Sequence, residues 1–437
     1  MGCAAEPRDQ PTSAFAIIQR MRIPLRTGLL ALALLASACA TRSPSTTPVE
    51  TQPATLLLVS VDGLRPTDVR TDSMPVLTAL GEANVRAEGM RPSFPALTFP
   101  NHYTLVTGLR PDRHGIVHNA MSDAGLGKFR TSDRAAMAKS DWWGGVPVWV
   151  SVERAGLRSA TMFWPGSEAQ IDGVRPWQWR PFRDDNRAAD SVAQVLQWLS
   201  LPAGERPRFV TMYLHQVDEA SHDHGPDSPQ AAQARREVDA ALAQLLDGLR
   251  AIGRSAATNL VVLSDHGFET IPPGQVLRVD DMVPTDVAEA VSDGQVIGFA
   301  PLPGRTADAE RLLLGRHAHY ACWRDDELPS RWNYGSHPRI PAIVCQMAAG
   351  WDALWPKKYA AILKRGDETR GSHGFDPDLP SMRATFIAAG PAFRPGTRLP
   401  VFDNVDVYPL LMRLLALPPE DNDGDISPLL PALEPAR

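Results

Sequence analysis

The feature that most constrains the fold is the alternation of short apolar runs with helical patterns from residue 54 onwards. Five runs, bounded by Asp, Gly or Pro, have the length and composition of buried strands: Thr55–Val61, Ser159–Phe163, Phe209–Leu214, Asn259–Leu263 and Arg383–Ala388. Helical patterns lie between them, at Met74–Ala87, Asn101–Thr107, Ala188–Leu199 and Gln230–Ile252. This alternation predicts an α/β fold with a mostly parallel central sheet and helices on both faces.

The length of 437 residues is enough for one large α/β domain or for two ordinary domains. We expect one main domain over residues 54–425, followed by a C-terminal tail over 426–437. The alternation breaks between about Gln275 and Arg370, where Pro, Trp and charged residues are frequent. We therefore expect a smaller insertion there, folding over one edge of the functional site.

The N-terminal region has the pattern of an export signal. A basic region that begins at Met21 precedes the apolar run Thr27–Leu35, which is too short to span a bilayer comfortably. Small residues then precede Cys39, a position that would also suit lipid acylation. We predict a signal segment over 1–40 with Met21 as the true start, and a disordered tether over 41–53. The protein is then periplasmic, either soluble or anchored by a lipid at Cys39.

Charge and cysteine content narrow the partners and the compartment. The net charge of −6 gives no basic field for nucleic-acid polymers or for an anionic membrane surface. Once Cys3 and Cys39 are set aside, Cys322 and Cys345 remain. In an oxidising compartment they form a predicted disulfide, which stabilises by on the order of 3 kcal/mol through chain entropy. The alternative is a pair of buried free cysteines.

Acidic and imidazole side chains lie at or just beyond the ends of apolar runs. They are Asp62, Asp218, His222, Asp265, His266 and His373. Ligands of parallel α/β sheets bind beyond the carboxyl ends of the strands, so these groups are expected to gather at one place. Each alone could be a turn residue or an ordinary histidine, but the combination favours a site. Carboxylates and imidazoles without thiolates suit a catalytic zinc or a similar metal.

Local spacing indicates how two of these pairs could bind. Asp218 and His222 are four residues apart, which places both on one face of a helical turn. Asp265 and His266 are adjacent and can share a metal only where the chain turns, which Gly267 allows.

Thr98 has two interpretations. It precedes a helical run, so its hydroxyl could act as an N-cap. The same place, beside free N–H groups and the positive end of the helix dipole, suits a nucleophile that attacks a bound phosphate. A nearby metal would activate the hydroxyl, and we favour the nucleophile.

Several motifs together resemble the nucleotide pyrophosphatase/phosphodiesterase family of the alkaline phosphatase superfamily. They are Asp62-Gly63, Thr98-Phe99-Pro100-Asn101-His102, Gly108-Leu109 with His114-Gly115, Asn119, Asp218-x-x-x-His222, Ser264-Asp265-His266-Gly267 and His373-Gly374. The resemblance covers roughly Leu56 to Leu417 and is specific as a combination. It implies an alkaline-phosphatase-like α/β fold with two zinc ions.

The resemblance also implies roles for individual residues. Asp62, Thr98, Asp265 and His266 resemble the ligands of one zinc, and Asp218, His222 and His373 those of the other. Thr98 resembles the nucleophile and Asn119 the amide that holds a phosphate oxygen. Phe99 and Tyr213 occupy positions where the family packs aromatic rings against the nucleobase. Leu97 departs from several animal members, which carry lysine there.

These observations predict a metal-dependent hydrolase of nucleotide phosphodiester and pyrophosphate bonds, which releases nucleoside monophosphates through a covalent phosphothreonine. Its partners are small nucleotide substrates. The alternatives are a phosphodiesterase of lipid headgroups, a phosphomonoesterase or sulfatase of the same superfamily, and a non-catalytic periplasmic zinc-binding protein. A monoesterase needs added positive charge, yet no Arg lies between Ser93 and Thr107. A non-catalytic protein has no need of the Thr98 hydroxyl.

Overall fold

The structure is a computed structural model that describes residues 54–435. The predicted signal segment, the tether and Cys39 lie outside these residues and remain predictions.

A central sheet of eight strands forms the main domain, in the order β20-β2-β19-β9-β1-β8-β6-β7. The strands in that order are β20 (Thr397–Leu399), β2 (Val85–Ala87), β19 (Phe386–Ala389), β9 (Thr258–Leu263), β1 (Thr55–Val61), β8 (Phe209–Leu214), β6 (Ser159–Met162) and β7 (Gln178–Arg180). All neighbouring pairs are parallel except those made by β19, which is antiparallel to β9 and β2. The predicted mostly parallel sheet is confirmed.

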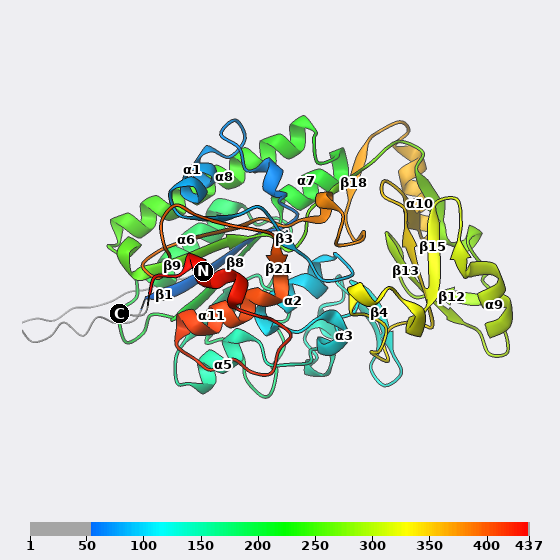
Figure 1. Cartoon of the computed structure of the whole chain (residues 1–437), viewed down its shortest axis with the longest axis horizontal. Helices are drawn as coiled ribbons and strands as arrows, with labels where there is room; N and C mark the ends of the chain where they lie inside the picture. Colours follow the sequence, from blue (N-terminus) through cyan, green and yellow to red (C-terminus); the bar gives the residue numbers. More distant parts are fainter. Residues whose placement is uncertain (1–53, 436–437) are drawn as a thin grey trace, which may run out of the picture. The chain divides into compact units, whose positions relative to one another are not determined.

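Helices cover both faces of this sheet (Figure 1). One layer contains α1 (Pro75–Ala83), α6 (Ala188–Leu199) and α8 (Pro229–Ala251), and the other contains α2 (Thr98–Thr107), α5 (Val148–Arg154) and α11 (Val407–Leu415). The central strand β1 is buried throughout: Leu56 and Leu58 belong to one hydrophobic core, while Leu57 and Val59 belong to the other. A strand buried on both faces reads as a continuous apolar run, which is why its sequence shows no polar alternation.

One predicted helix is too long. The pattern over Met74–Ala87 predicted a single helix, but α1 ends at Ala83 and β2 follows it. The Asn84 side chain donates from Nδ2 to the Leu80 carbonyl at 3.0 Å and closes the helix end. The three residues of β2 pair with β19 on one side and with β20 on the other, and Val85 and Ala87 are buried. Pairing with strands distant in the sequence therefore decides the structure of this segment.

The segment that we expected to be an insertion contains a second sheet, whose five strands are all antiparallel to their neighbours. In spatial order they are β12 (Ala288–Ala290), β13 (Val296–Pro301), β16 (Ile343–Met347), β15 (Tyr320–Arg324) and β14 (Gly315–Arg316), accompanied by α9 (Thr306–Leu313) and α10 (Pro356–Lys364). Cys322 and Cys345 are directly opposite each other on β15 and β16 and form a disulfide, as predicted.

The insertion returns to the main domain beside the strand ends. β10 (Glu269–Ile271) pairs antiparallel with β18 (Arg370–Ser372), although about a hundred residues separate them in the chain. This pairing places the residue after β18 close to the residues that follow β9. The segment that we expected to be a C-terminal tail contains a 3₁₀ helix, Ser427–Ala432, whose Leu429 is fully buried.

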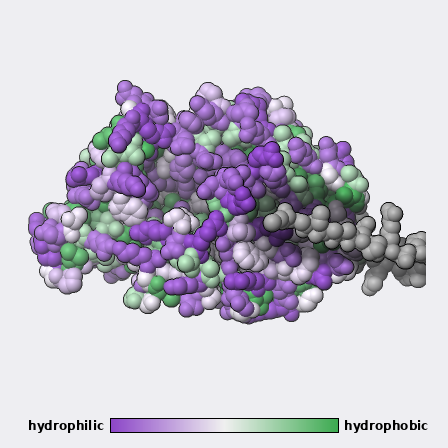
Figure 2. Space-filling model, turned by 180° about the vertical axis from the view of Figure 1, so that it is seen from behind, coloured by the Kyte–Doolittle hydropathy of each residue, from purple (hydrophilic) through white to green (hydrophobic). Residues whose placement is uncertain are grey.

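The surface is mainly polar. Figure 2 shows a face on which hydrophobic residues appear in small groups among hydrophilic ones. Among residues 54–435, Leu363 and Leu430 are the exposed large hydrophobic side chains. No helix within the same residues is both long enough and apolar enough to cross a membrane.

Candidate active site

Three adjacent strands deliver the three predicted carboxylates to one edge of the sheet. Asp62 follows β1 and Asp265 follows β9 after one residue, while Asp218 lies in α7 (Gln216–His224), which begins shortly after β8. Because β9, β1 and β8 are parallel neighbours, their carboxyl ends coincide. His373 joins them from the end of β18. The structure thus brings together every residue that the sequence proposed as a metal ligand.

Three compact groups of potential ligand atoms result. Asp218, His222 and His373 form one group, Asp62, Asp218 and His266 form a second, and Asp62, His102 and Asp265 form a third, each with its ligand atoms within 4.8 Å of one another. The spacing of Asp218 and His222 works as predicted, because both lie on α7 with Asp218 Oδ1 3.6 Å from His222 Nε2.

All three imidazoles are oriented in the same way. Each Nδ1 lies within hydrogen-bond distance of a backbone carbonyl: His222 with Gly371 at 3.1 Å, His266 with Gly267 at 3.0 Å and His373 with Ala96 at 2.9 Å. A carbonyl can only accept, so Nδ1 carries the proton and Nε2 presents its lone pair. The Nε2 atoms of His222 and His373 face each other at 3.1 Å, an arrangement that a shared cation would stabilise.

The carboxylates also fit a metal. Asp62 Oδ1 and Asp218 Oδ1 are buried and have no hydrogen-bond partner among the described residues. Burial, reinforced by the charges of Asp265 and Asp218, raises the pKa of Asp62 well above its usual value, and burial also raises that of Asp218. Cations bound between such groups would restore their charged forms. The donor set therefore fits divalent cations with a mixed oxygen and nitrogen preference.

Asp265 has a different environment. Burial alone would raise its pKa, but the imidazoles of His266 and His102 outweigh burial and hold the pKa of Asp265 well below its usual range. Its Oδ2 lies 2.9 Å from His266 Nε2 and 3.2 Å from His102 Nδ1. Of the three carboxylates of the site, Asp265 is thus the one whose pKa the surrounding side chains lower below its usual value.

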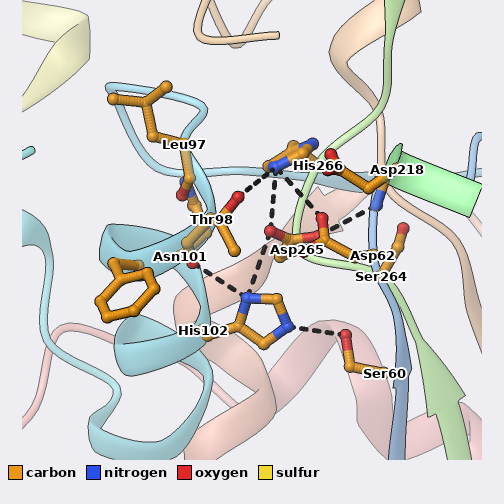
Figure 3. Close-up of polar contacts among 12 residues, drawn as sticks. Ser60, Asp62, Leu97, Thr98, Asn101, His102, Asp218, Ser264, Asp265 and His266 are labelled. Atoms are coloured by element: carbon orange, nitrogen blue, oxygen red, sulfur yellow. Dashed lines mark hydrogen bonds and ion pairs between the residues drawn. The ribbon is translucent and has the colours of Figure 1, made fainter. Parts of the chain in front are cut away.

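Thr98 is the first residue of α2, so it does not occupy the N-cap position, and Leu97, which does, makes no side-chain cap bond. The Thr98 hydroxyl lies 3.3 Å from His266 Nε2, among the predicted ligands (Figure 3). The N-cap interpretation of Thr98 is therefore wrong. The helix position still places a positive dipole end beside the hydroxyl.

Asn119 is tied directly to this helix end. Its Oδ1 accepts a hydrogen bond from the Phe99 backbone N–H at 3.0 Å. That bond fixes the orientation of the amide and leaves Nδ2 as the group that can donate to a phosphate oxygen.

His102 is a residue of the site that the sequence motifs contained but to which they assigned no role. It lies on α2 one turn after Thr98 and is fully buried. Its Nδ1 lies 2.9 Å from the Thr98 carbonyl, and its Nε2 lies 2.8 Å from Ser60 Oγ (Figure 3). Since the carbonyl requires a donor, Nε2 accepts from the Ser60 hydroxyl. Both nitrogens are thus engaged, and His102 orients the site rather than binding a metal. The four-residue spacing from Thr98 was the available signal.

Two other residues have contacts beyond those that the sequence predicted. The Tyr213 hydroxyl donates to Asp62 Oδ2 at 2.6 Å, so the residue holds a carboxylate as well as lining the cavity. A Cβ on Gly267 would lie 2.1 Å from the Ser381 carbonyl oxygen. Gly267 is therefore required by the close approach of two backbones as well as by the local turn.

A cavity of about 430 Å³ extends from Thr98 and Asn119. Its walls combine aromatic rings, small polar groups and four carboxylates: Asp62, Thr98, Phe99, Asn119, Thr131, Ser132, Arg134, Met137, Phe163, Trp164, Pro165, Gly166, Glu168, Phe182, Asp184, Tyr213 and Asp218. Phe182, which the sequence did not reveal, follows the edge strand β7 in a segment without a motif. The parallel pairing of β7 with β6 brings it to the cavity.

The fold and this arrangement of carboxylates, imidazoles and a helix-terminal threonine define an alkaline-phosphatase-like α/β hydrolase. Residues 56–376 match the family profile of type I phosphodiesterases/nucleotide pyrophosphatases. The chain belongs to this family, a metal-dependent group of phosphodiester hydrolases, as its motifs predicted.

Relatives support the assignment. An uncharacterised pyrophosphatase/phosphodiesterase of Schizosaccharomyces pombe is 33% identical over 86% of this chain and 80% of its own length. A venom phosphodiesterase of Naja atra is 33% identical over 88% of this chain, and mouse ectonucleotide pyrophosphatase/phosphodiesterase family member 1 is 32% identical over 86%. The chain spans 47% and 42%, respectively, of the length of these two animal relatives.

The fold also matches solved structures. Murine ectonucleotide pyrophosphatase/phosphodiesterase 5 superposes with a TM-score of 0.81 at 29% identity, over 87% of this chain and all of that one. The same protein has been solved as an inactive threonine-to-alanine variant in complex with AMP, with the same TM-score.

Proposed function

We propose that the chain hydrolyses phosphodiester and pyrophosphate bonds of small nucleotides and releases nucleoside monophosphates, through a covalent ester of Thr98. The observation that carries this proposal is the cavity that begins at the Thr98 hydroxyl and continues between aromatic rings. A reactive group at one end and flat apolar surfaces at the other match a substrate with a phosphate and a base. The AMP complex of the murine relative supports the same class of substrate.

Two Zn²⁺ ions are the proposed cofactors. Asp62, Thr98, Asp265 and His266 would hold one ion, and Asp218, His222 and His373 the other. When bound, the ions would supply Lewis-acid activation of the hydroxyl and neutralise charge on the phosphate. The inward lone pairs of the three Nε2 atoms and the unpartnered carboxylate oxygens support this assignment.

The residues of the chain would then act in two displacements. Thr98 Oγ1 gives its proton to water and forms a bond to phosphorus, while the bond from phosphorus to the leaving oxygen breaks on the opposite side and the leaving oxygen takes a proton from water. A water molecule next attacks the phosphorus of the Thr98 ester and loses a proton, while the bond from phosphorus to Oγ1 breaks. Oγ1 regains a proton, and the nucleoside monophosphate is released. Asn119 Nδ2 would donate to a non-bridging oxygen in both steps, and the α2 N-terminus would favour the negative charge there.

The charge of the cavity favours a diester over a monoester. Within the described part of the chain, Arg134 is the one cation among the residues that line the cavity. Its guanidinium already donates to the Phe182 carbonyl and lies 3.8 Å from Glu168. Among the described residues that line the cavity, the one positive charge is thus already shared with Glu168, and this favours a substrate with less negative charge than a monoester.

A lipid-headgroup diester is a second candidate. Glu168 and Asp184 place two carboxylates among the aromatic residues that line the cavity. Carboxylates beside aromatic faces also suit a quaternary ammonium group. Activity on glycerophosphocholine would support this candidate.

We also propose export to the periplasm, with a lipid at Cys39 as one option. The Cys322–Cys345 disulfide supports an oxidising compartment. Cell fractionation of the wild type and a Cys39→Ser variant would separate soluble from lipid-anchored protein.

The decisive experiment compares turnover of a nucleotide diester with that of the matching monoester by the zinc-loaded protein. We expect the diester to be hydrolysed with a much higher kcat/KM and to release a nucleoside monophosphate. Preference for the monoester would show that the second phosphate charge is accommodated and would overturn the proposal. Full activity in a strong chelator would overturn the role of metals.

A further inference from the structure

One short segment of the insertion, Trp332–Arg339, lies against the main domain, and we call it the strap. The Trp332 ring stacks on Phe94 with ring centroids 4.0 Å apart, and the Tyr334 hydroxyl donates to the Val117 carbonyl at 3.0 Å. Asp112 Oδ1 accepts from three consecutive strap N–H groups, those of Gly335, Ser336 and His337, at 2.8–3.0 Å. The strap thus lies along the part of the main domain that immediately precedes Asn119 in the sequence.

Arg339 ends the strap and is 9% exposed. Its Nη1 donates to the Gly115 and Trp142 carbonyls at 2.8 and 2.7 Å, and its Nη2 donates to the Asp141 carbonyl at 2.8 Å. Its Nε donates to Asp123 Oδ2 at 2.8 Å. The guanidinium also stacks over the Trp142 ring, 4.7 Å from its centroid. Four of the five N–H donors of this side chain are therefore engaged.

The partners of Arg339 enclose one wall of the cavity. Residues 119–137, which we call the wall, contribute Asn119, Thr131, Ser132, Arg134 and Met137 to the cavity. Gly115 precedes the wall, Asp123 belongs to it, and Asp141 with Trp142 follows it. A single planar group from the insertion thus ties both ends of the wall together. Gly115 has a φ of +78°, which favours glycine, and a Cβ there would lie 2.9 Å from Arg339 Nη1.

A second contact from the insertion reaches the residue beside Asn119. His118 Nε2 lies 3.1 Å from the Val296 carbonyl of β13, and His118 Nδ1 accepts from the Ala120 N–H at 3.0 Å. His118 thus links the residue before Asn119 to the insertion and accepts a hydrogen bond from the residue after it. The Asn119 side-chain amide is held separately, by the Phe99 backbone N–H.

We propose that Arg339 is a positioning residue: through the wall it sets Asn119 against the phosphate and keeps the wall closed over the nucleotide. This inference rests on the proposed function for the role of Asn119. It assigns to the insertion the task of shaping the substrate cavity, although the strap supplies no residue that lines it.

The test is a double-mutant cycle with the zinc-loaded full chain, using the 4-nitrophenyl ester of a nucleoside 5′-monophosphate as the probe. Arg339→Lys keeps the charge but cannot reproduce the planar fork. We expect it to lower kcat at least tenfold, and to lower kcat less than twofold in an Asn119→Ala background. Arg324→Lys is the matched control, because Arg324 lies in the same insertion and pairs with Glu310 and Glu327 there. It should leave kcat unchanged.

Equal losses of kcat for Arg339→Lys in both backgrounds would overturn the proposal, as would a silent Arg339→Lys. If Arg339→Lys does not fold, Tyr334→Phe replaces it in the cycle. Tyr334→Phe removes the single hydrogen bond to the Val117 carbonyl and keeps the ring. We expect it to lower kcat by less than the tenfold expected of Arg339→Lys, and to have no effect on kcat in the Asn119→Ala background. An Asn119→Ala variant with unchanged kcat would overturn both the positioning role of Arg339 and the role of Asn119. The proposed hydrolysis is tested separately, because it predicts that Thr98→Ala is inactive.

Hydrogen–deuterium exchange gives a readout that requires no substrate. Arg339→Lys should raise the exchange of wall peptides over residues 119–137 and leave peptides of β1 and β9 protected. Unchanged exchange in the wall would overturn the proposal whatever the activity measurements show.

Discussion

At the scale of single residues, Thr98 is placed for chemistry rather than for helix stability. Its hydroxyl contacts His266 and makes no capping bond to the backbone of α2. We therefore predict that Thr98→Ala abolishes phosphodiester turnover, while Thr98→Ser keeps a measurable fraction because a hydroxyl remains. Thermal unfolding of both metal-free variants should stay within about 2 °C of the wild type, because the half-buried Thr98 hydroxyl makes a single polar contact within residues 54–435, whose loss costs on the order of 0.5 kcal/mol. Near-wild-type turnover by Thr98→Ala would exclude it as the nucleophile.

His102 supports the same site through the contacts of its buried ring. It links the Thr98 carbonyl, Asp265 and Ser60. Residues that orient metal ligands typically contribute 10- to 100-fold to metal affinity, so we predict a zinc affinity about 10- to 100-fold lower for His102→Gln. Ser60→Ala should have a smaller effect in the same direction. Competition titration with a zinc chelator measures both, and an unchanged affinity in His102→Gln would show that the contact has no role in orienting the ligands.

At the scale of elements, the cavity depends on rings from two different parts of the fold. Phe99 lies on α2, and Phe182 follows the edge strand β7. A stacked base contributes about 1–3 kcal/mol, so Phe99→Ala and Phe182→Ala should raise KM for a nucleotide ester about 5- to 150-fold. Turnover of bis(4-nitrophenyl) phosphate should change much less, because that substrate has no base. Equal losses on both substrates would show that the rings support the fold instead.

Tyr213 must be tested with a more conservative substitution than alanine, because its hydroxyl donates a hydrogen bond to Asp62. Replacing the whole side chain would disturb a predicted metal ligand and confuse base recognition with metal binding. Tyr213→Phe keeps the ring that faces Phe182 and removes only the bond to Asp62.

The sequence was informative for elements whose environment is uniform. β8 and α6 have the predicted bounds because the strand is almost wholly buried and the helix has a regular apolar face. It was misleading at Val85–Ala87, where three residues join the sheet only because β19 and β20 lie beside them. The ligands at strand ends could be grouped from topology, whereas Phe182 and Arg339 could not, because their roles depend on long-range packing that leaves no local pattern.

At the scale of the whole molecule, His118 couples stability to pH where the insertion meets the main domain. Burial lowers the pKa of His118 to about 4, whereas the unfolded chain titrates near the usual value of 6.5. Between these values the unfolded state binds more protons, so the free energy of unfolding falls as pH decreases from about 6.5 to 4. The slope contributed by one such group is at most about 1.4 kcal/mol per pH unit.

We predict that His118→Gln flattens this dependence, measured by urea unfolding between pH 7 and pH 4.5 in chelator. The chelator removes any contribution of metal binding to the slope. His224→Gln, which changes an exposed histidine, is the control and should retain the wild-type slope. A wild-type slope in His118→Gln would mean that other groups carry the pH dependence.

The central claim, that Thr98 forms a covalent ester during hydrolysis, is tested most directly by the stereochemical course at phosphorus. A nucleotide diester made chiral by sulfur and oxygen-isotope substitution would be hydrolysed in isotopically labelled water and the configuration of the product determined. Each in-line displacement inverts phosphorus, so two successive displacements predict overall retention. Overall inversion would mean that water attacks the substrate directly, and it would contradict the role of Thr98 as nucleophile.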